Sequence, residues 1–242
     1  MNTQDDGEAL KRRDFVRWFT VAAVAGVALI VTSTINIQQS NQLGTIVEEL
    51  VDVRLQVTAV QAAVRVDQQY LAVIEVLAAK ASDSLTPQQI PEIANLVAGL
   101  AILYRDDGLT SSLVLAVMER ESNFRPDAIS RSGAVGIMQI IPETAELHLT
   151  ALGEFWSVEL MQQPQMNISV GVMELMRLHR IYMVEGLETK DEWHITLTAY
   201  FWGPTNARRL ISAKGEKVKV PSLEYAMGVR EFQNIIRSQG VF

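Results

Sequence analysis

Hydrophobic and polar positions divide the chain into an uncharged stretch, a heptad-like stretch and a series of amphipathic segments. The uncharged stretch is "WFTVAAVAGVALIVTSTI", from Trp18 to Ile35. At about 1.5 Å per residue a helix of this length reaches roughly 27 Å, close to the thickness of a bilayer core. The pattern therefore predicts one transmembrane helix over residues 18–35.

Charges on either side of Trp18–Ile35 predict its orientation. Four basic residues, Lys11, Arg12, Arg13 and Arg17, precede it, and acidic residues are the first charges after it. The positive-inside rule then keeps residues 1–17 in the cytoplasm and places the rest of the chain in the periplasm of a bacterial cell. The alternative is a cleaved signal peptide ending near "VTS". Both interpretations export the C-terminal part.

Residues 36–81 carry apolar positions at alternating spacings of three and four. The seam consists of Leu43, Ile46, Leu50, Val53, Val57, Val60 and Val64. Such a seam predicts a helical stalk that joins copies of the chain as a coiled coil over Leu43–Val64. A single amphipathic helix packed against its own domain explains the pattern equally well. The run "SDSLTPQQIP", residues 82–91, breaks the pattern and is the best domain boundary.

The segment from residue 89 to 242 is expected to form a separate domain. It contains several runs with helical periodicity or with a proline at a plausible first turn, and alternating strand patterns are scarce. The expected fold class is all-α. A small irregular or short-strand element is expected in "AISRSGAVGIMQII".

Composition excludes several kinds of chemistry. A net charge of −7 argues against nucleic acid as a partner, because phosphate binding relies on clustered Lys and Arg. The chain has no cysteine, which removes disulfides and thiolate nucleophiles. The histidines, His148, His179 and His194, show no ligand spacing. We predict no metal and no cofactor.

Glu121 is the candidate for chemistry. In a helix from Ser111, it lies on the same face as Val114, Val117 and Met118, which is expected to enter the core. Burial disfavours the charged form of a carboxyl and raises its pKa, which suits a general acid. A purely structural glutamate that accepts backbone or arginine donors would fit this helix equally well.

The loop after Glu121 carries a resemblance. "ESNFRPDAISRSGAVGIMQIIPETA" is similar to the signature of lytic transglycosylases of the soluble-lytic-transglycosylase (SLT) family, which belongs to the lysozyme superfamily. "NISVG", Asn167 to Gly171, and Pro221 with Glu224 resemble later family signatures. The loop residues that match, with Ile137 in place of Leu, are Glu121, Ser122, Phe124, Pro126, Ala128, Ser130, Gly133, Ala134, Gly136, Met138, Gln139, Pro142, Thr144 and Ala145.

The resemblance implies a lysozyme-like α domain that acts on peptidoglycan glycan strands. Family enzymes cleave the β-1,4 bond between N-acetylmuramic acid and N-acetylglucosamine and leave a 1,6-anhydro end. Glu121 would serve as acid and then as base, so that no second carboxylate is needed. Of the residues expected to contact substrate, Ser130 and Gln139 would bond the sugars, and Tyr200 would orient Glu121 or the sugar ring. The remaining members of this expected set are Gly136, Met138 and Glu224.

One signature departs from the family. Where the family has Ala-Tyr-Asn-Ala-Gly, this chain reads "AYFWGP", with Phe201 and Trp202 in place of Asn and Ala. The aromatic pair can stack on a sugar or pack between helices. Two other functions stay open: a goose-type hydrolase, with Glu143 as the nearest second carboxylate, and a glycan-binding scaffold without turnover. A bacterial and a viral origin are both compatible with the sequence.

Overall fold

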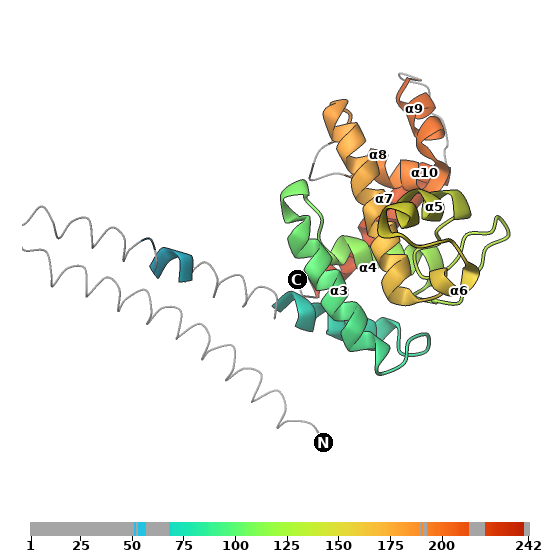
Figure 1. Cartoon of the computed structure of the whole chain (residues 1–242). Coiled ribbons are helices and arrows are strands. Elements are labelled where there is room, and N and C mark those ends of the chain that lie inside the picture. The colour runs from blue at the N-terminus through green and yellow to red at the C-terminus, as the bar shows by residue number, and fades with distance from the viewer. Residues whose placement is uncertain are drawn as a thin grey trace, which may run out of the picture. The chain divides into compact units, whose positions relative to one another are not determined.

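The computed structural model describes residues 51, 53–56, 68–188, 190, 193–212 and 221–239. Over these residues the chain is helical and forms no extended strand, which confirms the all-α prediction (Figure 1). The elements are α3 (Gln89–Leu103), η1 (Arg105–Asp107), α4 (Ser111–Ser122), α5 (Pro142–Leu152), α6 (Val158–Met161), α7 (Pro164–Val184), α8 (His194–Trp202), α9 (Pro204–Ser212) and α10 (Pro221–Ser238).

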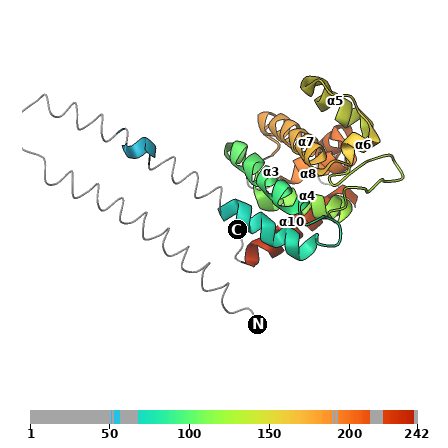
Figure 2. The ribbon, with the colours of Figure 1, turned by 60° about the horizontal axis from the view of Figure 1, so that its bottom comes forward.

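Helix α4 is the centre of the domain. It contacts α3 on one side and α10 on the other, as Figure 2 shows. Every residue from Ser111 to Met118 is buried, so this helix has no solvent face until its last turn. Its first turn is capped by Thr110, whose hydroxyl accepts a hydrogen bond from the Leu113 amide at 3.2 Å. Side chains of α4 can therefore reach solvent only in its last turn.

The helical residues 68–80 pack into the same core as α4. Val73, Val76 and Leu77 are buried there together with residues of α3 and α4. Residues 82–91 therefore connect two helices whose buried residues share one core. The predicted seam over Leu43–Val64 lies outside the described residues, except for Val53.

The predicted transmembrane segment, Trp18–Ile35, also lies outside the described residues. None of the helices formed by the described part of the chain is both long and apolar enough to cross a membrane.

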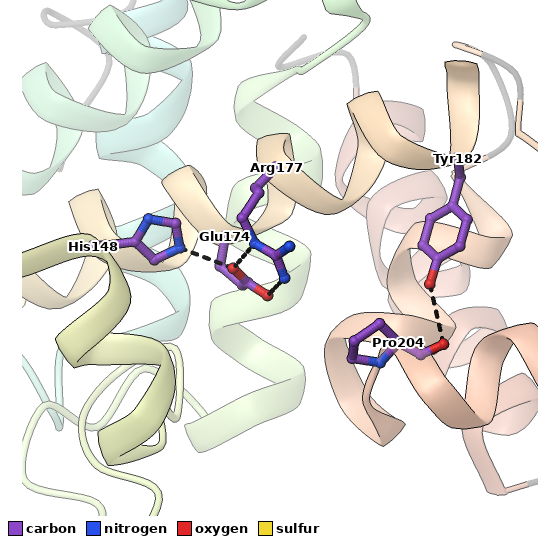
Figure 3. A network of polar contacts seen from close by, with 5 residues as sticks. All are labelled: His148, Glu174, Arg177, Tyr182 and Pro204. Carbon is purple, nitrogen blue, oxygen red and sulfur yellow. Dashed lines mark hydrogen bonds and ion pairs between the residues drawn. The ribbon is translucent and has the colours of Figure 1, made fainter. Parts of the chain in front are cut away.

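A buried ion network attaches α5 to α7 (Figure 3). Glu174 on α7 accepts hydrogen bonds from both nitrogens of the Arg177 fork at 2.7 Å, and its Oε2 lies 2.8 Å from His148 Nε2 on α5. Burial tends to raise the pKa of Glu174, but the bonds from Arg177 and His148 outweigh burial and hold it below 4.5. Glu174 is thus a carboxylate with two structural partners, which leaves it poorly placed for acid–base chemistry.

The irregular element expected between α4 and α5 is present. It consists of two isolated antiparallel bridges, which pair Ile129 with Val135 and Val135 with Ile140. The bridges fold the loop into a compact double turn beside the end of α4.

Candidate functional site

The site begins where α4 ends. Asn123 and Phe124 follow its last residue with φ of 53° and 60°, so two successive residues adopt the left-handed conformation. For a bulky residue, that backbone conformation is unfavourable by roughly 1–3 kcal/mol. Phe124 offsets this cost because its ring is fully buried and lies 6.4 Å from that of Phe232 on α10. The sharp stop turns the chain back over the helix end and leaves Glu121 in the final turn.

Ser122 ties the returning loop to the helix end. Its hydroxyl donates to the Ile137 carbonyl at 2.8 Å and accepts from the Arg125 amide at 3.0 Å. A buried serine with these partners is a structural joint between the first and last parts of the loop. The residue next to Glu121 in sequence therefore fixes this loop to the end of α4.

Asn167 on α7 holds the loop from the other side. Its Oδ1 accepts from the Met138 amide at 2.7 Å, and its Nδ2 donates to the carbonyls of Val135 and Met161 at 2.8 Å each. The side chain is fully buried, so each of these bonds satisfies a backbone group that water cannot reach. This asparagine belongs to the "NISVG" segment and supports the loop from beneath.

Two glycines allow these close approaches. Gly136 has a φ of 85°, and a Cβ there would lie 2.2 Å from Asn167 Nδ2 and 2.3 Å from the Met161 carbonyl oxygen. Gly171 lets Met138 rest on α7, since a Cβ would lie 2.5 Å from the Met138 sulfur. Met138 is fully buried between loop and helix, so its side chain supports the site rather than lining it.

Glu121 is half-buried, and its carboxyl has one described hydrogen-bond partner, the Tyr225 hydroxyl, which donates to Oε1 at 2.6 Å. Burial raises its pKa from 4.5 to about 7, and the bond from Tyr225 and the charge of Arg120 oppose this rise only in part. A carboxyl with such a pKa can both donate and accept a proton near neutral pH.

Tyr200 lies close to the same carboxyl but makes a different bond. Its hydroxyl donates to the Met138 carbonyl at 2.9 Å. Burial, together with the charge of Glu121, raises the pKa of Tyr200 well above 10, so the phenol stays protonated and keeps donating. The direct donor to Glu121 is Tyr225 on α10, which the sequence analysis did not single out.

The other predicted substrate residues take part in the loop's own bonding to different degrees. Gln139 uses its amide nitrogen to donate to the carbonyls of Gly136 at 2.8 Å and Ala128 at 3.1 Å. The Ser130 hydroxyl accepts from the Ala134 amide at 3.0 Å and lies 2.9 Å from the Ser132 hydroxyl. The structure thus brings Gly136, Met138, Gln139 and Tyr200 together around one loop. Glu224, although next to Tyr225, is exposed and shares no described contact with them.

The two residues that depart from the family signature are partly exposed. Phe201 is 47% exposed and stacks on Tyr225, with ring centroids 4.6 Å apart and planes inclined by 16°. Trp202 is 38% exposed, so the interpretation of Trp202 as a core residue between helices is wrong. Its backbone carbonyl accepts from Asn206 at 2.8 Å, which joins the ends of α8 and α9 while the indole stays at the surface.

In the described part of the chain, no group of three or more His, Asp or Glu side chains could hold a metal ion.

The domain is helical, and its central helix α4 carries in its last turn a glutamate, Glu121, whose pKa burial raises to about 7. Residues 102–221 match the family model "Transglycosylase SLT domain", so this part of the chain is similar to the SLT domain. The loop signature, Glu121 to Ala145, lies inside the matched region.

Curated relatives match the same region. A membrane-bound lytic murein transglycosylase C from Edwardsiella ictaluri is 33% identical over 117 residues, which cover 47% of this chain and 33% of the relative. Its counterpart from Photorhabdus laumondii is 33% identical over 113 residues, covering 46% of this chain and 32% of the relative. The chain thus spans about a third of the length of these relatives.

Solved structures with weaker likeness include an inactive mutant of the lytic transglycosylase Slt from Pseudomonas aeruginosa. It is 23% identical with a TM-score of 0.46, covering 58% of this chain and 23% of that one. The 70 kDa soluble lytic transglycosylase from Escherichia coli is 19% identical with a TM-score of 0.45, covering 72% of this chain and 29% of that one.

The Tyr225 bond predicts a pH effect. Because this bond lowers the pKa of Glu121, Tyr225→Phe should raise that pKa further and move the loss of the protonated form to higher pH. Carboxyl carbon NMR of Glu121, recorded as a function of pH, measures the shift directly. An unchanged or lower pKa in the variant would show that the bond does not act on the carboxyl. Tyr104→Phe, a tyrosine change outside the site, serves as the control.

Proposed function

We propose that this chain is a peptidoglycan lytic transglycosylase that cleaves the bond between N-acetylmuramic acid and N-acetylglucosamine. The observation that carries the proposal is Glu121 in the last turn of α4, a half-buried residue whose carboxyl has its pKa raised by burial to about 7 and accepts a hydrogen bond from Tyr225. The family of the domain and the names of its curated relatives support the same chemistry.

In the proposed reaction Glu121 donates its proton to the bridging oxygen while the bond from C1 of the muramic sugar to that oxygen breaks. The resulting carboxylate accepts the proton of the C6 hydroxyl as that oxygen bonds C1 and closes the 1,6-anhydro ring. Glu121 ends protonated, as it began, so no water is consumed. The Tyr225 hydroxyl stabilises the carboxylate between the two steps, because it donates to Oε1.

Two of the residues predicted to bind sugar fit a role in holding the loop at least as well as a role in contacting the sugar directly. Ser130 and Gln139 both bond the loop backbone. We propose that they shape the sugar site and that Tyr200 fixes the loop carbonyl beside Glu121. A second enzyme function, hydrolysis, would need a carboxylate-held water. Glu143 is exposed on the first turn of α5, and no described contact joins it to Glu121.

We also propose that Trp18–Ile35 anchors the chain in the inner membrane, with residues 1–17 cytoplasmic and the transglycosylase domain periplasmic. The uncharged segment and its basic flank support this proposal. The relatives from Edwardsiella ictaluri and Photorhabdus laumondii are named membrane-bound. Association of copies through Leu43–Val64 would fit a stalk between membrane and domain.

Glu121→Gln should abolish glycan cleavage, because the amide keeps the shape of the side chain and cannot donate the proton. General acid–base groups typically contribute about 10²–10⁴-fold, and a lone carboxyl should lie at the upper end. Release of muropeptides from purified sacculi measures the loss, and mass spectrometry identifies anhydro or reducing ends. A mutant that keeps a tenth of wild-type activity would rule out Glu121 as the acid. Glu119→Gln, two residues earlier on the same helix, is the matched control.

Trp202→Ala should weaken binding of glycan fragments by about 1–2 kcal/mol, the range of a lost aromatic contact. Because the indole is 38% exposed, the loss of stability should stay well below the roughly 3–5 kcal/mol of a truncated core aromatic. Calorimetric titration and thermal unfolding of the same variant separate the two effects. Unchanged affinity with a large fall in melting temperature would sink the stacking role.

The anchor predicts that the protein stays in the membrane fraction after a high-salt wash and dissolves only in detergent, since salt strips electrostatic association alone. Protease should reach residues 89–242 only after the outer membrane is opened. Recovery of a soluble form that begins near Thr34 would show instead that the segment is a cleaved signal peptide.

A further inference from the structure

We propose that Phe201 is a positioning residue, whose ring holds Tyr225 in the orientation from which its hydroxyl donates to Glu121. This inference rests on the proposed function and deepens it, because it assigns a task to one of the two residues by which this chain departs from its family signature. The chain of contacts runs from α8 through α10 to the end of α4.

The geometry of the three side chains is continuous. Phe201 lies in the last turn of α8, and Tyr225 lies in the early part of α10, which packs against α8. Their rings are nearly parallel, at 16°, with centroids 4.6 Å apart. The Tyr225 hydroxyl then reaches Glu121 Oε1 at 2.6 Å. Phe201 thus contacts one face of the Tyr225 ring, and the Glu121 carboxyl bonds its hydroxyl.

The exposed fractions of the two residues show that Phe201 covers Tyr225. Tyr225 is 2% exposed, whereas Phe201 is 47% exposed. Phe201 still buries about half of its side chain, and its ring lies against that of Tyr225, so it helps to keep the Tyr225 ring out of water. A small residue at position 201 would open the Tyr225 ring to water and remove its stacked neighbour. The tyrosine would then be free to sample other rotamers.

Rotation of Tyr225 matters because its ring carries a single hydroxyl. That group cannot follow the carboxyl if the ring turns, and a hydrogen bond weakens steeply once its angle departs from linear. A planar aromatic neighbour restricts the ring to one plane, and offset-stacked pairs gain from that arrangement. Phe201 therefore acts on Glu121 only through Tyr225.

A double-mutant cycle tests this dependence. Phe201→Ala should lower the single-turnover cleavage rate about three- to tenfold, in the range of a lost aromatic pair, while KM changes less. In a Tyr225→Phe background the same substitution should cause no further loss. Phe201→Tyr, which keeps the planar ring, should restore the rate, and Phe201→Leu, which keeps apolar volume without a flat ring, should not. Losses that simply add in the two backgrounds would overturn the proposal.

A second measurement does not depend on turnover. Carboxyl NMR titration of Glu121 in Phe201→Ala should show its pKa displaced upward, in the same direction as in Tyr225→Phe, because the donor is lost in both. Phe155→Ala removes an aromatic side chain that is 88% exposed elsewhere and should leave the titration unchanged. An unshifted Glu121 in Phe201→Ala would contradict the proposal. If wild-type protein releases no muropeptides while the titration shifts as expected, the proposed function fails and the positioning role of Phe201 stands.

Discussion

The carboxyl of Glu121 stands between two opposed effects, and the rest of the site is arranged around them. Burial raises its pKa to about 7, and one hydroxyl from Tyr225 limits that rise. With less burial the group would be ionised at neutral pH and could not donate a proton. With more donors its conjugate base would be too weak to accept the second proton. The packing of α10 against α4 sets this balance, because α10 carries Tyr225.

The loop opposite Glu121 is rigid because buried polar groups hold its backbone. Ser122 bonds the Ile137 carbonyl, and Asn167 bonds backbone groups of both the loop and the α6 end. Gly136 permits the approach at which these bonds form. The segment that carries the carbonyl contacted by Tyr200 is therefore held by two different helices, α4 and α7. Groups that are already held in place need no rearrangement, and hence no reorganisation free energy, during a reaction.

The aromatic pair that departs from the family signature divides into two different environments. Both side chains are partly exposed, but their contacts differ: Phe201 stacks on Tyr225 and so joins α8 to α10, whereas the backbone carbonyl of Trp202 accepts from Asn206 on α9. Two adjacent residues at the end of one helix can differ in this way because successive side chains point about 100° apart. The sequence pattern alone does not distinguish the contacts of these two adjacent aromatic residues.

The sequence by itself determined the helical class, the end of α4 near Glu121 and the loop signature, because periodicity, capping residues and glycine positions are local properties. It also placed Glu121 on an apolar face, from which a raised pKa follows. It could not identify Tyr225, which on α10 looks like one more core-facing residue beside Val229 and Ile236. Only the tertiary structure decided which buried hydroxyl meets the carboxyl, since that contact joins residues more than a hundred positions apart. The tertiary structure also decided that Trp202 is partly exposed, because the exposure of a side chain at a helix end depends on which elements pack beside it.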